Sequence, residues 1–252
     1  MIDELIISPL ALAISFALIA FLYSSVGLGG GSSYSALLAI MGVNHLILPS
    51  ISLTLNLIVT SIGSINYGRA GYVKLKLLFP FLVTSIPMSY IGGLITLPKN
   101  AFYFLLMVTL IFVVVRIYLF DNPSIQLNLS DKNRIGLSLG IGGLLGFISG
   151  ALGIGGGVYL VPFIIIFGLG TEKEAAATGA LFIWLNSLSG ITARIHKFPD
   201  IDIILPLCLA VLMGALGGSF LGSNKFQPKT MQKLLGSVII IAIIFLFKKV
   251  VL

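Results

Sequence analysis

Val26-Gly-Leu-Gly-Gly-Gly31 and Leu152-Gly-Ile-Gly-Gly-Gly157 are two copies of one G-x-G-G-G pattern, placed 126 residues apart. Each copy follows an apolar run of membrane-spanning length and precedes a much shorter one, Ser32–Met41 or Val158–Phe167. A helix of about ten residues covers about 15 Å, half the thickness of the hydrocarbon layer. Adjacent glycines also disfavour continued helix. The pattern therefore predicts, in each copy, a helix broken at membrane depth and followed by a half-helix.

The broken helices indicate a binding chemistry. The N-terminus of a half-helix presents free N–H groups and the positive end of the helix dipole, which favour an anion. Glycine lets the backbone approach a ligand closely, and two such motifs from two halves could converge near the membrane midplane. In the alternative interpretation, the glycines serve only close helix packing. The predicted binding residues are Gly29, Gly30, Gly31, Ser32, Ser33, Asn56, Thr60, Gly155, Gly156, Gly157, Tyr159, Asn186 and Arg194.

The composition of the whole chain places it in a membrane. Of its 252 residues, 58% are hydrophobic and 9% charged, with a mean hydropathy of +1.12, whereas soluble domains carry about 25% charged residues. One cysteine and two histidines exclude a disulfide framework and leave little for a metal site. The net charge of +7 does not indicate nucleic acid, because the basic residues stand singly or in pairs between apolar runs, as cytoplasmic anchors do.

The distribution of apolar runs predicts an all-α integral membrane protein with about eight spans in two homologous repeats, each with a glycine-broken helix. The first run has an acidic N-terminal flank, so we expect a retained span rather than a signal peptide. Residues 1–120 form the predicted N-terminal repeat, 121–133 a polar linker and 134–252 the C-terminal repeat. The predicted spans are Leu5–Val26, His45–Tyr67, Lys74–Leu97, Asn100–Phe120, Arg134–Leu152, Thr171–Ile195, Ile201–Gly222 and Pro228–Val251.

Further landmarks support the duplication. The offset of 126 residues also pairs Gly42 with Gly168 and Pro80 with Pro206. Whether the halves are parallel or inverted stays open, since the two arrangements put similar numbers of Lys and Arg on one side. The orientation depends on whether the short runs cross the membrane or re-enter it. We expect transport by rocking of one half against the other.

Polar residues inside the spans carry the remaining predictions. Asn56 and Thr60 share a helix face, and they and Asn186 either face the substrate or bond neighbouring helices. Arg194 falls at a span end, where it either extends to the interface or attracts an anion. Glycines spaced by four residues indicate helix packing faces; these are Gly142, Gly146 and Gly150, and Gly214, Gly218 and Gly222.

Acidic residues are expected only at span ends and in loops, so no catalytic or proton-relay carboxylate is predicted within the membrane. An intramembrane hydrolase would need a nucleophile with a paired base. His45 and His196 lie at span ends without such a partner, so we do not expect an enzyme.

The duplicated segments Ser-Val-Gly-Leu-Gly-Gly-Gly-Ser (25–32) and Ala-Leu-Gly-Ile-Gly-Gly-Gly-Val (151–158) resemble those of the TauE/SafE family of sulfite-exporter-like permeases. The resemblance implies a multi-pass carrier in the cytoplasmic membrane of a prokaryote. It also implies export of small sulfur-containing anions such as sulfite or organosulfonates, without a cofactor. The expected partners are that anion and the bilayer, with homo-oligomers also considered and no nucleic acid. The alternatives are a permease for another anion, such as a carboxylate, and a non-transporting membrane scaffold.

Overall fold

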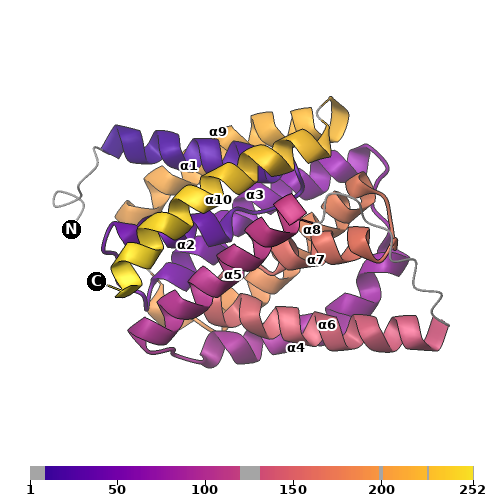
Figure 1. Cartoon of the computed structure of the whole chain (residues 1–252), viewed down its shortest axis with the longest axis horizontal. Helices are drawn as coiled ribbons and strands as arrows, with labels where there is room; N and C mark the ends of the chain where they lie inside the picture. Colours follow the sequence, from indigo (N-terminus) through magenta and orange to yellow (C-terminus); the bar gives the residue numbers. More distant parts are fainter. Residues whose placement is uncertain (1–8, 120–130, 199–200, 226, 252) are drawn as a thin grey trace.

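The computed structural model describes residues 9–119, 131–198, 201–225 and 227–251, and every regular element in them is helical (Figure 1). The predicted all-α membrane class is confirmed. The helices are α1 (Pro9–Ser24), α2 (Gly31–Ile40), α3 (Leu48–Arg69), α4 (Leu75–Leu94), α5 (Lys99–Leu119), α6 (Asp131–Leu152), α7 (Gly157–Ile166), α8 (Glu172–Thr192), the 3-10 turn η1 (Ile195–Lys197), α9 (Ile201–Asn224) and α10 (Pro228–Val251).

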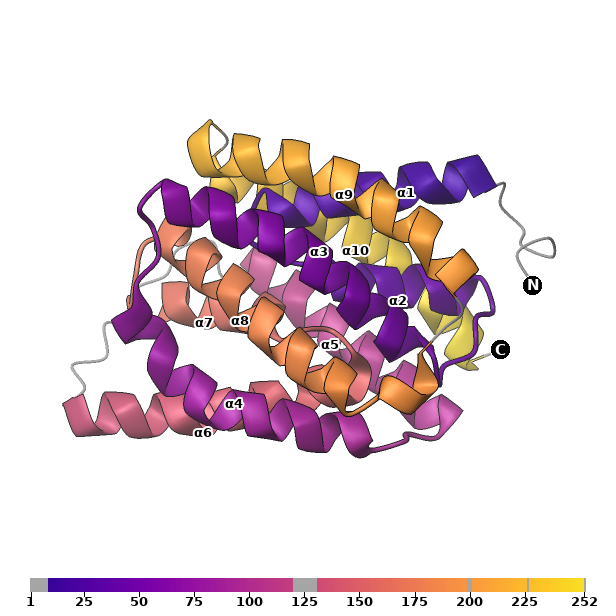
Figure 2. The same ribbon diagram turned by 180° about the vertical axis from the view of Figure 1, so that it is seen from behind.

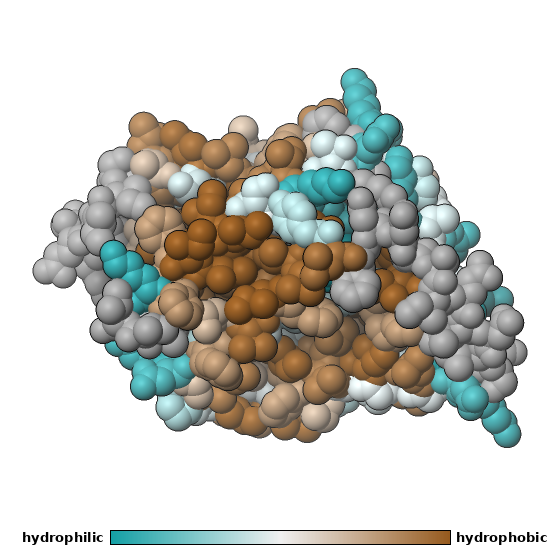
Figure 3. Space-filling view, in the orientation of Figure 1, coloured by the Kyte–Doolittle hydropathy of each residue, from teal (hydrophilic) through white to brown (hydrophobic). Residues whose placement is uncertain are grey.

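Seven of the described helices are long and apolar enough to cross a membrane. They are α3, α4, α5, α6, α8, α9 and α10. The first of the eight predicted spans, Leu5–Val26, corresponds to α1, which has 16 residues. Residues 5–8 of that span lie outside the described part, as does most of the predicted linker. Large apolar side chains cover the outside of the bundle (Figure 3), as expected for a surface that faces lipid.

The two short helices re-enter the membrane region instead of crossing it. In Figures 1 and 2, α2 returns toward the end of the bundle from which α1 comes, and α7 returns in the same way beside α6. Contacts within the first hairpin hold this arrangement. The rings of Phe16 and Tyr34 stack with centroids 5.2 Å apart, and Tyr23 Oη lies 2.8 Å from Ser32 Oγ and 2.7 Å from Ser33 Oγ.

Because both short helices re-enter, three crossing helices separate the two hairpins and the halves have opposite orientations. Figures 1 and 2 show α3 running against α8 and α5 running against α10, and α1 begins at the same end of the bundle at which α10 ends. The structure thus answers the question left open by the charge count: the halves are inverted, which is a common architecture in secondary transporters.

The halves are also intertwined, since α1 packs on α9 and α4 packs on α6. Glycines make both contacts close, as predicted, because a Cβ atom at any of six positions would collide with a carbonyl of the neighbouring helix. We call these contacts the two glycine seams. In them, Gly142, Gly146 and Gly150 of α6 face Phe81, Ser85 and Ser89 of α4, and Gly214, Gly218 and Gly222 of α9 face Ala17 and Phe21 of α1 and Ser25 just after it.

Candidate functional site

The two glycine loops share left-handed backbone angles at two matching positions, although Gly155 of the second loop also has a positive φ (84°) and the matching Gly29 does not. In the first loop, between α1 and α2, Gly27 has φ 75° and Gly30 has φ 89°. At the matching positions of the second loop, between α6 and α7, Gly153 has φ 74° and Gly156 has φ 75°. Residues with a side chain rarely adopt these left-handed angles. The repeated glycines therefore allow a sharp turn in each loop, and each turn leads into the start of a half-helix.

The first turns of α2 and α7 are free of side-chain caps. Their N-cap residues are Gly30 and Gly156, neither of which has a side chain to accept a bond from the backbone. The early N–H groups of a helix have no partner within it, and the helix dipole is positive there. Both half-helices therefore present N–H groups that can bind an anion without competition from a capping oxygen.

Asn56 of α3 contacts both glycine loops. Its Nδ2 donates to the carbonyl of Ile154 in the second loop at 3.1 Å, while its side chain fills the space beside Gly29 and Gly31 of the first. Its Oδ1 is buried and has no hydrogen-bond partner. Of the predicted residues, Asn56, Gly29, Gly31 and the second loop are thus brought together at one point.

Ile183 of α8 takes the corresponding place on the other side. Its side chain lies against Gly29, Gly155 and Gly157, as that of Asn56 lies against both loops. The centre of the protein is therefore polar where α3 approaches and apolar where α8 approaches. Ile183 was not predicted, because an isoleucine in an apolar span carries no signal of its own.

Several hydroxyl groups surround the loops. Ser52 Oγ donates to the carbonyl of Gly31 at 2.7 Å, and Ser32 and Ser33 share Tyr23 as described above. Thr60 Oγ1 instead donates to the carbonyl of Asn56 within its own helix at 2.6 Å. Thr60 therefore lies one turn from Asn56 on α3, but its hydroxyl group already donates to the backbone of its own helix.

Three buried oxygens beside the loops have no hydrogen-bond partner among the described residues: Tyr34 Oη, Ser149 Oγ and Ser187 Oγ. The Tyr34 ring lies against Gly30, and Ser149 and Ser187 lie near the second loop. An unpaired buried polar group costs about 1–3 kcal/mol, and such groups are rare in native proteins. Their concentration at the loops indicates a place that is polar enough to hold a hydrated or hydrogen-bonding ligand.

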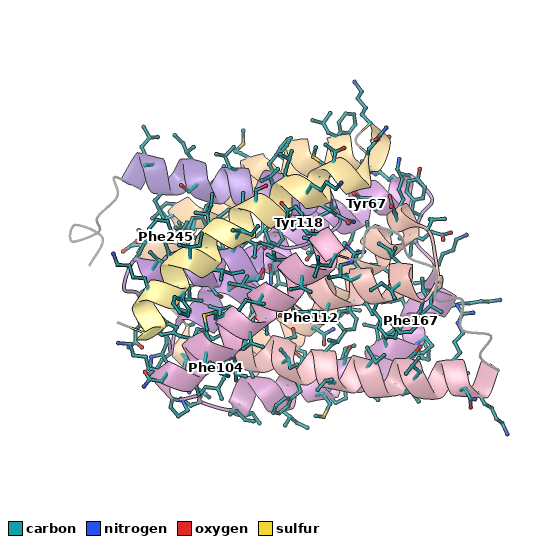
Figure 4. The ribbon with its side chains drawn as sticks, in the orientation of Figure 1. Tyr67, Phe104, Phe112, Tyr118, Phe167 and Phe245 are labelled. Carbon is teal, nitrogen blue, oxygen red and sulfur yellow. The ribbon has the colours of Figure 1, made fainter. Side chains whose placement is uncertain are left out.

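Two predicted residues make their contacts with other helices. Asn186 Nδ2 donates to Ser85 Oγ of α4 at 3.1 Å and to a carbonyl of its own helix, so it joins α8 to α4. Tyr159 of α7 lies against α5, where its ring centroid is 6.0 Å from that of Phe112 (Figure 4).

Arg194 holds the end of α6. It is 4% exposed, and its Nη2 donates to the carbonyls of Gly150 and Ala151 at 3.0 and 3.1 Å. A cation is stabilising at a helix C-terminus, where the dipole is negative. Burial lowers the pKa of Arg194 to about 10, so it stays charged at neutral pH. Its donors go to the helix that leads into the second loop.

Tyr67 donates a hydrogen bond to the backbone at the end of α1, as Arg194 does at the end of α6. Its Oη donates to the carbonyl of Ser25, just after the end of α1, at 2.7 Å. Tyr67 and Arg194 are 127 residues apart at the ends of α3 and α8. Each glycine loop is therefore anchored at its start by a side chain from the helix that crosses behind it. The spacing of 127 residues between Tyr67 and Arg194 could have pointed to Tyr67 as an anchor. The two residues differ in type, so the match is not visible in the sequence.

Replacing Arg194 by Gln is expected to destabilise the protein. The carbonyls of Gly150 and Ala151 would lose their donors in a buried position, and a loss of about 2 kcal/mol lowers the melting temperature of a chain of this length by roughly 4–8 °C. Thermal unfolding of the purified protein in detergent measures the shift. The matched control is Lys197→Gln, which removes an exposed cation bonded to Thr96; an equal shift in the control would contradict the anchoring role.

A groove of about 560 Å³ lies beside the first half-helix, between α1, α2 and α10. Its walls are almost entirely apolar, and Ser33 is one of only two hydroxyl residues in its lining. Phe245 of α10, labelled in Figure 4, forms part of its outer wall. The groove connects the outer surface of the bundle with the hydroxyl pair of α2.

Comparisons with known proteins agree with this architecture. A probable membrane transporter protein, y4hK of Sinorhizobium fredii, is 30% identical over 92% of this chain and 96% of its own length. YjnA, a probable membrane transporter protein of Bacillus subtilis, is 26% identical over 86% of this chain and 91% of its own. MJ0441, a probable membrane transporter protein of Methanocaldococcus jannaschii, is 23% identical over 94% of both chains.

No solved structure matches the chain. The family model of the sulfite exporter TauE/SafE matches residues 12–246, which include both glycine loops and all the helices that position them. The two hairpins, the inverted halves and the relatives agree with one another: the chain is a multi-pass membrane protein of the sulfite exporter TauE/SafE family, and the relatives described above are named as probable membrane transporters.

Proposed function

We propose that this protein is a secondary transporter that exports small sulfur-containing anions, such as sulfite or organosulfonates, across the cytoplasmic membrane of a prokaryote. The observation that carries the proposal is the junction of two uncapped half-helix N-termini around Asn56. Backbone N–H groups there suit a small oxyanion better than a cation. The name of the matching family gives the class of anion to test first.

The charge distribution supports the choice of an anion. In the described part of the chain, the acidic residues lie in first turns at helix ends, as do Glu172 and Asp202. No fixed negative charge from the described residues therefore repels an anion at the loops. In the proposed mechanism, N–H groups and hydroxyls replace part of the water around the anion, and the site opens to each side of the membrane in turn.

The distribution of basic residues gives the orientation for this proposal. With the halves inverted, ten of the 15 Lys and Arg residues lie at the end of the bundle where α5 ends and α6 begins. The positive-inside rule places that end in the cytoplasm. Both chain termini then lie on the outer side, and fluorescent labelling of a cysteine introduced at either end tests this placement.

Sulfite flux into liposomes that contain the purified protein tests the function. We expect saturable uptake that is competed by sulfoacetate and sulfate-like oxyanions but not by acetate. Competition by acetate alone would replace the sulfur anion with a carboxylate. Flux no greater than that of empty liposomes, for every anion tested, would contradict transport and favour the scaffold alternative. Fluorescence-detected size exclusion of the same sample verifies that the protein is folded.

A further inference from the structure

A basic cleft lies far from the glycine loops, at the end of the bundle assigned above to the cytoplasm. Its volume is about 500 Å³, and it opens between the first turns of α4 and α6. We call it the α4–α6 cleft. It is lined by Lys74, Lys76, Leu77, Pro80, Arg134, Ile135 and Ser138.

The positive charge of the α4–α6 cleft is only partly neutralised. Lys74 forms an ion pair with Glu174 of α8 at 3.6 Å, and this is the single ion pair found among the described residues. Lys76 and Arg134 therefore have no carboxylate partner in the described part of the chain. Two helices also begin here, so that the positive ends of their dipoles add to the charge of the side chains.

The floor of the cleft combines apolar walls with one hydroxyl group. Leu77 and Ser138 are 8% and 4% exposed, and Pro80 and Ile135 form apolar walls between them and the basic rim. Ser138 is buried and lines the cleft together with these apolar residues. A buried donor that faces a cationic cleft is suited to a negatively charged oxygen.

The surroundings of the cleft indicate where its ligand comes from. Leu75 and Phe79, on the same turns of α4, are more than 60% exposed and present apolar side chains on the outside of the bundle beside the cleft. A ligand that reaches the cleft from this side passes apolar side chains before it meets the cations. Cationic pockets between membrane helices on the cytoplasmic side bind the headgroups of anionic lipids.

We propose that the α4–α6 cleft binds the phosphate of an anionic phospholipid from the cytoplasmic leaflet. Lys76 and Arg134 contact the phosphate oxygens, Ser138 donates to one of them, and the walls at Leu77, Pro80 and Ile135 contact the glycerol and first acyl carbons. The lipid would then join the starts of α4 and α6, which belong to different halves of the chain. A soluble phosphate shares the same headgroup chemistry and is distinguished by the experiment.

Native mass spectrometry of the protein in detergent, titrated with phosphatidylglycerol or phosphatidylcholine, tests the proposal. We expect one tightly bound phosphatidylglycerol per chain and no comparable site for phosphatidylcholine. The variant Lys76→Gln/Arg134→Gln should bind phosphatidylglycerol about 30-fold more weakly, since each basic residue near an anionic lipid contributes about 1 kcal/mol. Inorganic phosphate at millimolar concentration should not displace the lipid.

The matched control is Lys99→Gln/Lys248→Gln, which removes two cations at the opposite end of the bundle and should leave the affinity unchanged. Displacement by inorganic phosphate would keep the phosphate site but assign it to a soluble ligand. Equal losses of affinity in the two double variants, or equal binding of both lipids, would overturn the proposal. The melting temperature of each variant shows whether it is folded, independently of lipid binding.

Discussion

Replacing Asn56 by Asp is expected to reduce anion flux by about 1000-fold. The substitution keeps the shape of the side chain and puts a negative charge where it touches both glycine loops. Two like charges about 4 Å apart repel by about 4 kcal/mol at an effective dielectric constant near 20, and that energy corresponds to about three powers of ten. The initial rate of sulfite uptake into liposomes measures the effect.

The matched control for this substitution is Asn186→Asp. It buries the same charge on a helix of the same bundle, but at the contact between α8 and α4 instead of the loops. We expect a similar loss of thermal stability from both variants and a much smaller loss of flux from Asn186→Asp. Equal losses of flux in two folded variants would contradict the placement of the anion at Asn56. Flux through Asn56→Asp should also recover at low pH, when the introduced carboxyl group is protonated.

Replacing Gly146 by Leu is expected to prevent the protein from folding to a monodisperse species. A Cβ atom at Gly146 would overlap the Ser85 carbonyl of α4, so that α4 and α6 could not keep their contact. Adding a larger side chain to a packed contact commonly costs about 1–3 kcal/mol. Here the atoms that the new side chain meets belong to the backbone of α4, which cannot move aside as a side chain could. Fluorescence-detected size exclusion of the solubilised variant measures the folded fraction.

Gly140 offers a control on the same helix. It lies six residues earlier in α6, and a Cβ atom there would have nothing within 4 Å. Gly140→Leu adds a side chain of the same size and should give a normal elution profile, because leucine also favours helix over glycine. A normal profile for Gly146→Leu would show that the seam between α4 and α6 can open without loss of the fold.

Much of the fold could be predicted from local sequence. The membrane class follows from composition, and α10 has the predicted bounds, Pro228–Val251. The packing role of Gly142, Gly146 and Gly150 follows from their spacing, because residues four apart share a helix face. These predictions depend on the residues of a single helix, and a sequence contains that information directly.

The path of the half-helices could not be predicted in the same way. A run of ten apolar residues has the same composition whether it continues across the membrane or turns back. The direction of α2 is decided by contacts between α1 and α2, such as the stacked rings of Phe16 and Tyr34. Such contacts form only after the chain has turned, so the orientation of the halves depends on tertiary structure.

Part of the arrangement around the glycine loops follows from the sequence, and the rest differs from it for one physical reason. The matching of halves at an offset of 126 residues holds at the loops, but along α3 and α8 the equivalent positions are 127 residues apart, as Tyr67 and Arg194 show. A shift of one residue rotates a helix position by about 100°. Asn186 therefore contacts α4, and Ile183 stands opposite Asn56.

The two glycine seams limit which parts of the protein can move as rigid bodies. Each seam joins a helix of residues 1–120 to a helix of residues 134–252, with carbonyls seated where a side chain would not fit. Rocking one sequence half against the other would have to slide both seams at once. The mechanical units are therefore composite: α1 travels with α9, α4 travels with α6, and a hinge for alternating access has to be sought where these pairs meet α3 and α8.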